Sequence, residues 1–145
     1  MPVPWRRRPT ILLVEDDAEM RRLLATNLRR DGYAVVECAN GDDALDWLGP
    51  GVLEGELERL PAAIVTDVRL PHFSGLEILA GVSGARDPIP VILITGFPEQ
   101  ETYQSAFALG ARCVLAKPFA LEDLRGALWA ALRPVHPPRE RGPAR

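Results

Sequence analysis

Polar and charged side chains follow four apolar runs of this sequence, each at the point where the run ends. They are Glu15, Asp16 and Asp17 after the first of these runs, Asp67 after the second, Thr95 at the end of the third and Lys117 after the fourth. Taken singly, each has an ordinary explanation, such as a helix cap for Asp17 or a surface cation for Lys117. Their occurrence at four separate run ends favours a shared site.

The chemistry of such a cluster follows from its charges. Glu15, Asp16 and Asp67 would be like charges at close range, so one would take up a proton unless a cation lay among them. Oxygen ligands with room for water suit magnesium, with manganese or calcium as substitutes. A carboxylate in this setting can attack phosphorus and form an acyl phosphate. Lys117 could pair with Asp67 at rest and with a phosphoryl oxygen afterwards, and the Thr95 hydroxyl could donate to another such oxygen.

Alternating strand and helix patterns predict the elements that position these residues. The predicted strands are residues 10–14, 33–38, 62–66, 90–95 and 112–116. Apolar residues at helical spacing predict helices that begin near Ala18, Gly41, Leu76, Glu99 and Leu121. This order predicts an α/β fold, a five-stranded parallel sheet covered by helices on both faces in a doubly wound sandwich. Functional residues of such sheets lie at the carboxyl ends of the strands.

Length and composition fit one globular domain. The chain has 145 residues, of which 47% are hydrophobic and 26% charged, a balance typical of folded proteins rather than disordered ones. Its apolar runs are near the length of one strand, so we expect no membrane span. We expect a cytoplasmic protein, because no long apolar stretch follows the arginines at 6–8 as a secretory signal would require.

Charge is distributed unevenly along the chain. The net charge is −3, and because residues 1–9 carry +3 and residues 134–145 carry +2, the segment between them carries −8. This acidic body argues against direct binding of nucleic acid by the domain. We expect a flexible basic arm over 1–9, a folded domain over 10–133 and a disordered tail or the start of a linker over 134–145. Segment 49–60 predicts a helix extension or a surface loop.

The sequence resembles the receiver domain of two-component response regulators. The matching segments, in chain order, are ILLVEDDAEMRRLL, TDVRLPHFSGLEIL, PVILITG and GARCVLAKPFALEDL. The resemblance covers about residues 10–133 and implies a flavodoxin-like (βα)5 fold with strand order 2-1-3-4-5. It also implies Mg²⁺ as cofactor and a phosphoryl group transferred onto an aspartate from a sensor histidine kinase or phosphotransfer protein. Such a domain is a switch rather than an enzyme acting on an outside substrate.

The resemblance assigns roles to the residues that take part in the transfer. Asp67 would be the phospho-acceptor, Thr95 the switch hydroxyl and Lys117 the lysine that contacts the acceptor. The bond between Lys117 and Pro118 is expected to be cis. Val114 stands three residues before the lysine, where the family often has Tyr or Phe. An aromatic ring at that position therefore cannot report phosphorylation in this chain.

The resemblance also implies a set of metal ligands. Asp16 and Asp67 would bind Mg²⁺ directly, and Glu15 would act through water. The main-chain carbonyl of Arg69, two residues past the acceptor, would be the remaining protein ligand. Asp17 matches a third acidic position that is less central to the site.

Partners and alternative functions follow from the same residues. The expected partners are a histidine kinase or phosphotransfer protein upstream, a protein partner downstream and, in a homodimer, a second copy. A degenerate receiver that acts as a phosphorylation-independent interaction module is the main alternative. An aspartate-nucleophile phosphatase would need an acid where Arg69 stands, and a flavin protein would need a phosphate-binding loop where the first acidic run stands. The proline-rich residues 134–145 fit both a stand-alone receiver and part of a longer regulator.

Overall fold

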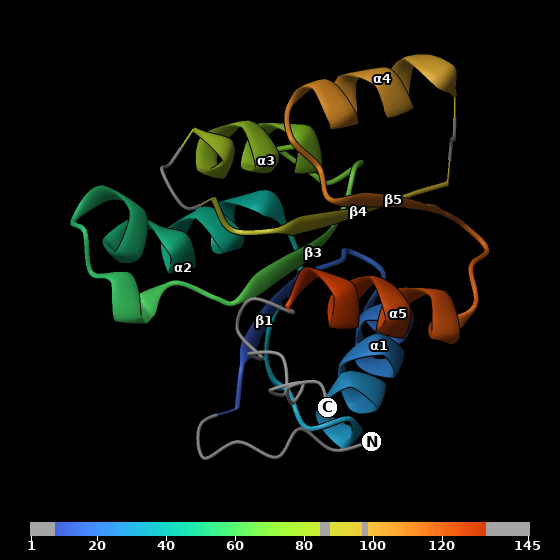
Figure 1. The fold of residues 1–145 in the computed structure, drawn as a ribbon, viewed down its shortest axis with the longest axis horizontal. Coiled ribbons are helices and arrows are strands. Elements are labelled where there is room, and N and C mark those ends of the chain that lie inside the picture. Colours follow the sequence, from blue (N-terminus) through green and yellow to red (C-terminus); the bar gives the residue numbers. More distant parts are fainter. Residues whose placement is uncertain (1–7, 85–87, 97–98, 133–145) are drawn as a thin grey trace, which may run out of the picture.

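A five-stranded parallel sheet forms the centre of the computed structural model, which describes residues 8–84, 88–96 and 99–132 (Figure 1). Its strands are β1 Thr10–Val14, β2 Ala34–Cys38, β3 Ala63–Asp67, β4 Val91–Thr95 and β5 Cys113–Ala116. They lie in the order β2-β1-β3-β4-β5, and each neighbouring pair is parallel. The predicted doubly wound fold and strand order are confirmed.

Helices follow the strands in chain order. They are α1 Ala18–Arg30, α2 Gly41–Leu53, α3 Gly75–Ser83, α4 Gln100–Ala108 and α5 Leu121–Ala131. The first of them begins where its capping residue predicts, because Asp17 Oδ1 accepts from the amides of Glu19 and Met20. Four predicted strands begin one residue too early, and Asp67 is the last residue of β3 rather than the first after it. The pairing of Asp67 with Ile94 on β4 keeps this residue in the sheet.

Two hydrophobic cores hold the helices to the two faces of the sheet. Alternate residues of β1 point to opposite faces, with Ile11 and Leu13 in one core and Leu12 and Val14 in the other. The first core packs against α1 and α5, and the second against α2, α3 and α4 (Figure 1). Burial of both faces explains why the strands read as continuous apolar runs. The polar residues that follow them are thereby placed at one edge of the sheet.

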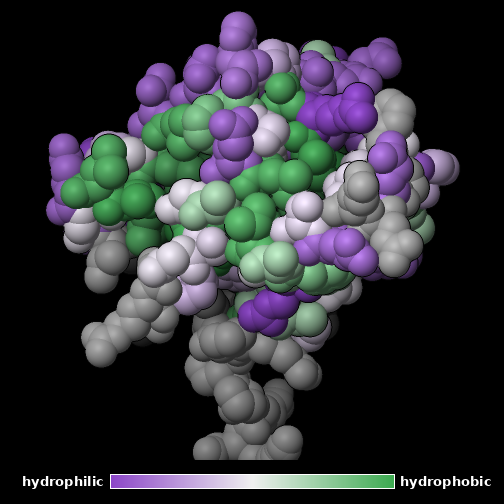
Figure 2. Space-filling view, turned by 90° about the horizontal axis from the view of Figure 1, so that it is seen from above, coloured by the Kyte–Doolittle hydropathy of each residue, from purple (hydrophilic) through white to green (hydrophobic). Residues whose placement is uncertain are grey.

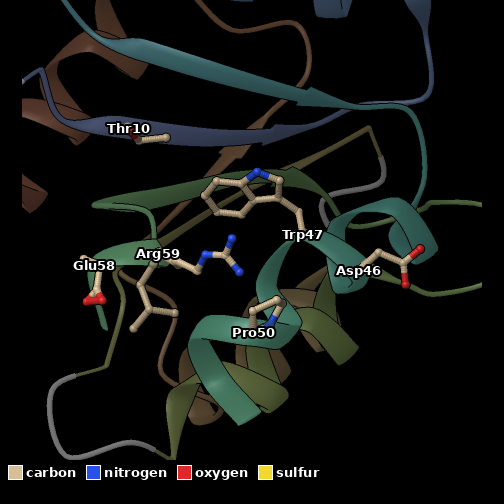
Figure 3. A pocket seen from close by; sticks show the side chains of 7 residues that line it. Thr10, Asp46, Trp47, Pro50, Glu58 and Arg59 are labelled. Atoms are coloured by element: carbon tan, nitrogen blue, oxygen red, sulfur yellow. The ribbon is translucent and has the colours of Figure 1, made fainter. Parts of the chain in front are cut away.

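Segment 49–60 extends α2 and then turns back toward β3. The helix continues past Pro50 to Leu53, and a short 3-10 helix η1, Leu57–Arg59, follows. Gly51 packs against Leu60, where a Cβ would lie 2.5 Å from the leucine Cδ2. Trp47, Pro50 and Arg59 contribute to the lining of a hollow of about 330 Å³ between α2 and η1 (Figure 3). Of the helix extension or surface loop that the sequence predicts, the structure shows a helix extension to Leu53 followed by a loop with one short 3-10 turn, and the Pro-Gly pair does not end the helix.

Apolar side chains reach the surface on the layer formed by α2, α3 and α4. Figure 2 views the molecule from the side that carries α3 and α4 and shows hydrophobic surface between polar margins. Val52 and Leu53 at the end of α2 and Phe107 on α4 are large exposed apolar residues. No helix among the described residues is long and apolar enough to span a bilayer. The predicted basic arm lies outside the described residues except for Arg8 and Pro9, and the predicted tail lies wholly outside them.

Candidate functional site

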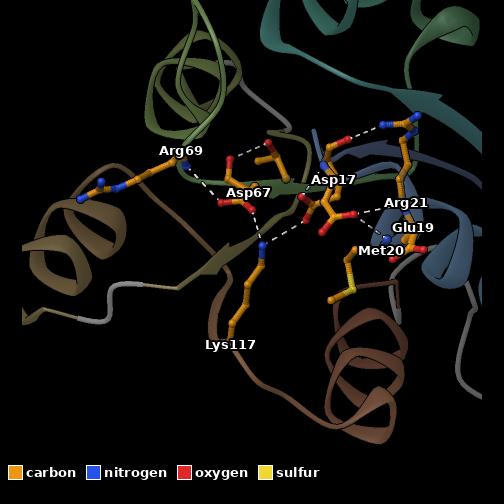
Figure 4. Close-up of polar contacts among 9 residues, drawn as sticks. Asp17, Glu19, Met20, Arg21, Asp67, Arg69 and Lys117 are labelled. Atoms are coloured by element: carbon orange, nitrogen blue, oxygen red, sulfur yellow. Dashed lines mark hydrogen bonds and ion pairs between the residues drawn. The ribbon is translucent and has the colours of Figure 1, made fainter.

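Three charged residues from separate strands meet at the carboxyl edge of the sheet (Figure 4). Lys117 Nζ, just past β5, lies 2.6 Å from Asp67 Oδ2 at the end of β3. The same ammonium lies 3.3 Å from Oε1 of Glu15, which follows β1. The predicted convergence of residues 50 and more positions apart is confirmed by these distances.

The carboxylate of Asp67 has a partner on each of its two oxygens. It is buried, and its Oδ1 accepts from the amide of Arg69 at 3.1 Å while Oδ2 faces Lys117. The loop after β3 folds back on this residue, since the amide of Gly75 donates to the carbonyl of Val68. A Cβ at Gly75 would overlap the carbonyl oxygen of Asp67. The absence of a side chain at Gly75 therefore lets the start of α3 lie directly against the main chain of Asp67.

The carboxylate of Glu15 is almost completely buried, which is unfavourable for its charged form. Its side chain is 1% exposed, and Oε2 accepts from the amide of Asp17 at 3.1 Å. Oε1 has only the ion pair with Lys117 among the described residues, and that contact does not have hydrogen-bond geometry. Burial raises the pKa of Glu15 to about 7, the charge of Asp67 adds to this, and the Asp17 amide and Lys117 oppose it. The ammonium of Lys117 thus faces two acidic side chains, those of Glu15 and Asp67.

The same surroundings also raise the pKa of Lys117. Burial would lower the pKa of the ammonium, but the hydrogen bond and charge of Asp67, together with Glu15, outweigh it and raise the pKa above its ordinary value. The side chain is therefore a permanent cation at neutral pH. The peptide between Lys117 and Pro118 is cis, as predicted.

The carboxylates of Glu15, Asp16 and Asp67 form a set that fits a hard divalent cation. Each offers one oxygen, and the three oxygens lie within 4.8 Å of one another. Glu15 Oε1 is buried without a hydrogen bond among the described residues, and Asp16 is exposed to solvent. An all-oxygen set with a buried, unsatisfied atom on one side and solvent on the other suits Mg²⁺, which keeps several waters. Asp17 instead caps α1 and orients Glu15 through its amide.

Thr95 lies at the same carboxyl edge of the sheet, at the end of β4, the strand between β3 and β5. It is 2% exposed at the end of β4, and its carbonyl accepts from the amide of Lys117 at 2.7 Å. This bond ties the strand that carries the hydroxyl to the residue that carries the ammonium. Arg69 places its amide against Asp67 and its side chain at the surface.

The sequence patterns considered above did not predict two features of the site. Ser74 and Glu77 form a capping box at the start of α3, with the serine side chain and the glutamate side chain each accepting from the other residue's amide. Their S-x-x-E spacing is a signal that could have predicted it. Arg21 donates from Nη1 to the carbonyl of Glu15 at 2.7 Å. Nothing in the sequence distinguishes it from Arg22, the next residue.

Comparison with known sequences gives one consistent family. A family model described as a response regulator receiver domain matches residues 11–128. Response regulator MprA of Mycobacterium tuberculosis (strain ATCC 25618 / H37Rv) is 33% identical over 127 residues, which are 88% of this chain and 52% of that protein. The chain therefore spans about half the length of the curated relatives it matches.

Solved structures agree with the sequence comparison. The chemotaxis protein CheY4 of Vibrio cholerae superposes with a TM-score of 0.74 at 26% identity, covering 87% of this chain and all (100%) of that one. The non-phosphorylated HemR receiver domain of Leptospira biflexa superposes with a TM-score of 0.75 at 25% identity, covering 87% of this chain and 95% of that one.

Proposed function

This chain belongs to the response regulator receiver domain family, and we propose that it accepts a phosphoryl group on Asp67 from a phosphohistidine of a sensor kinase or phosphotransfer protein. The observation that carries the proposal is the 2.6 Å contact between Lys117 Nζ and Asp67 Oδ2, beside the buried Glu15. It sets a cation against a carboxylate that lies at the edge of the sheet. A carboxylate in that position can act as a nucleophile toward phosphorus.

The proposed transfer needs little covalent chemistry from the protein. A bond forms between a carboxylate oxygen of Asp67 and phosphorus, while the bond between phosphorus and the donor imidazole nitrogen breaks and the imidazole takes up a proton. The amide of Arg69 and the ammonium of Lys117 hold the carboxylate in place for this attack. The same ammonium then pairs with a phosphoryl oxygen, and the Thr95 hydroxyl donates to another.

Glu15, Asp16, Asp67 and the main-chain carbonyl of Arg69 are the groups that would hold Mg²⁺. Once bound, the ion supplies charge neutralisation for the oxygens of the transferring phosphoryl group. The orphaned oxygen of Glu15 and the exposed carboxylate of Asp16 support this assignment. Glu15 is placed to act from the buried side of the pocket, and Asp16 from the solvent side.

Phosphorylation would act as a switch on the surface near β4 and β5. The modification adds a charge of roughly −1.5 to −2, by analogy with phosphate esters. Movement of Thr95 and Lys117 toward that charge would shift the neighbouring β5 and α4 between two states. A downstream protein would read the result in the cytoplasm, and the exposed Phe107 on α4 is one side chain available to such a partner.

Treatment with a small acyl phosphate tests the proposal. With Mg²⁺ present, the native protein should gain the mass of one phosphoryl group, and Asp67→Asn should gain none. Asp46→Asn, an exposed aspartate on α2, is the matched control and should be modified like the native protein. An unmodified native protein that remains folded would show a phosphorylation-independent interaction module instead.

A further inference from the structure

Arg21 on α1 reaches back to the loop that carries the acidic residues (Figure 4). Its Nη1 donates to the carbonyl oxygen of Glu15 at 2.7 Å, and its side chain is only 20% exposed. Because this hydrogen bond is made to the main-chain carbonyl of Glu15, the guanidinium of Arg21 holds the backbone of the loop in position. A charge-assisted bond of this length is among the stronger contacts that a loop can receive.

The guanidinium is itself held in place from β2. Arg21 Nε lies 3.6 Å from Oε1 of Glu37, whose other oxygen lies 3.0 Å from Arg29 Nη1. Arg29 also donates from Nη2 to the carbonyl of Val35 at 3.0 Å. Two arginines about two turns apart on α1 therefore share one glutamate, and this arrangement holds the guanidinium of Arg21 beside β2.

Glu15 is thereby fastened on both sides of its α-carbon. Its amide donates to the carbonyl of Cys38 at 3.0 Å, which extends the β1–β2 pairing by one residue, and its carbonyl accepts from Arg21. Its Oε2 accepts from the Asp17 amide. With these three bonds made, Oε1 has little freedom and is directed toward Lys117. The carbonyl that Arg21 holds belongs to the peptide that joins Glu15 to Asp16.

We propose that Arg21, steadied by Glu37, is a positioning residue that sets the β1–α1 loop so that the carboxylates of Glu15 and Asp16 converge with Asp67 on a divalent cation. The assignment rests on the proposed function for the identity of the cation. Groups that orient metal ligands without touching the metal typically change its affinity by about 10–100-fold when removed. Removing the guanidinium should therefore weaken Mg²⁺ binding while leaving the fold intact.

Calorimetric titration of the unphosphorylated 145-residue chain with Mg²⁺ tests this assignment. Arg21→Met keeps the apolar stem and should raise the Kd by about tenfold or more. Arg22→Met removes an exposed guanidinium from the adjacent position and should leave the Kd unchanged. Glu37→Gln should give a smaller rise, because Arg21 then keeps its bond to the carbonyl but loses its ionic support. Arg21→Lys should recover part of the affinity.

Amide hydrogen exchange in the metal-free protein supplies a readout that does not depend on metal or on phosphorylation. The amide of Asp17 should exchange faster in Arg21→Met than in the native protein, with the amides in the centre of β3 unchanged. A native Kd and native exchange in Arg21→Met, or an equal loss of affinity in Arg22→Met, would overturn the assignment. If Mg²⁺ binding follows the predicted order but Asp67 accepts no phosphoryl group, the proposed function fails and the positioning role stands.

Discussion

Lys117 offers a single ammonium to two buried carboxylates. Asp67 and Glu15 are both buried, and both face this cation, at 2.6 and 3.3 Å. Partly buried ion pairs lose much of their attraction to desolvation, so such a pair is weak evidence for a stabilising role. A cation held against a carboxylate where phosphoryl charge would arrive is instead well placed for catalysis, because it needs no reorganisation during the reaction.

Replacing Lys117 with glutamine should therefore slow phosphorylation of Asp67. We expect a loss of about a hundredfold in rate, the size typical of removing one preorganised group that faces developing charge. The rate is measured from the mass of the protein during treatment with an acyl phosphate at saturating Mg²⁺. Arg112→Gln, which removes an exposed cation just before β5, should react like the native protein. Equal rates for Lys117→Gln and the native protein would remove Lys117 from the mechanism.

Cys38 gives the protein a predictable sensitivity to alkaline pH. Burial and the nearby charge of Asp43, opposed by Arg21, raise the pKa of its thiol from an ordinary 9.0 to about 11. Between these values the unfolded chain releases a proton that the folded chain keeps, so the free energy of unfolding falls as pH rises from about 9 to about 11. Urea unfolding at several pH values should show a shallower fall for Cys38→Ala. Parallel curves for the two proteins would contradict this.

The loop between β3 and α3 shows how an element can set a functional residue. α3 begins at Gly75 against the carbonyl of Asp67, and the Ser74 capping box fixes that first turn. His72, in the same loop, has a left-handed backbone with φ of 69°. A non-glycine residue in this region is uncommon and needs support from its surroundings. Close packing in this segment lies at Gly75, against the main chain of Asp67, whereas His72 is exposed.

A pair of glycine substitutions separates this packing from helix propensity. Gly75→Ala should lower the free energy of unfolding by about 1–3 kcal/mol, because the added methyl would overlap the main chain at Asp67. Gly81→Ala, on the same helix with nothing within 4 Å of the added atom, should raise it by up to about 1 kcal/mol. Urea unfolding measures both. A Gly75→Ala protein as stable as Gly81→Ala would show that the loop yields freely.

α4 is the helix most suited to move. It begins without a side-chain cap, and Ala106 is its buried residue among the described side chains, whereas α1 is capped by Asp17 and buries Leu24, Ala25 and Leu28. Fewer buried contacts predict a lower free energy of local opening. Amide hydrogen exchange in the native protein should therefore be faster in α4 than in the centre of α1. Equal protection of the two helices would contradict a switch built on α4.

At the scale of the whole molecule, sequence patterns predicted the parts that depend on chain-wide rules. Apolar runs and helical spacing located the elements, and the parallel sheet then required Asp67, Thr95 and Lys117 to meet at one edge. Contacts that depend on the direction of a side chain could not be predicted from the sequence patterns. Arg21 and Arg22 are alike in sequence, and only α1's rotation against β2 selects the first. Likewise, the close approach of Gly51 on α2 to Leu60 joins residues whose contact helical spacing does not predict.

Chemical trapping of the phosphorylated residue identifies directly which carboxylate accepts the phosphoryl group. Borohydride reduces an aspartyl phosphate to homoserine, so the native protein can be treated with an acyl phosphate and Mg²⁺, reduced, digested and sequenced by mass spectrometry. We expect homoserine at position 67 and aspartate at positions 16 and 17. Reduction at position 16, or an unreduced Asp67 in a protein that has gained a phosphoryl group, would contradict it.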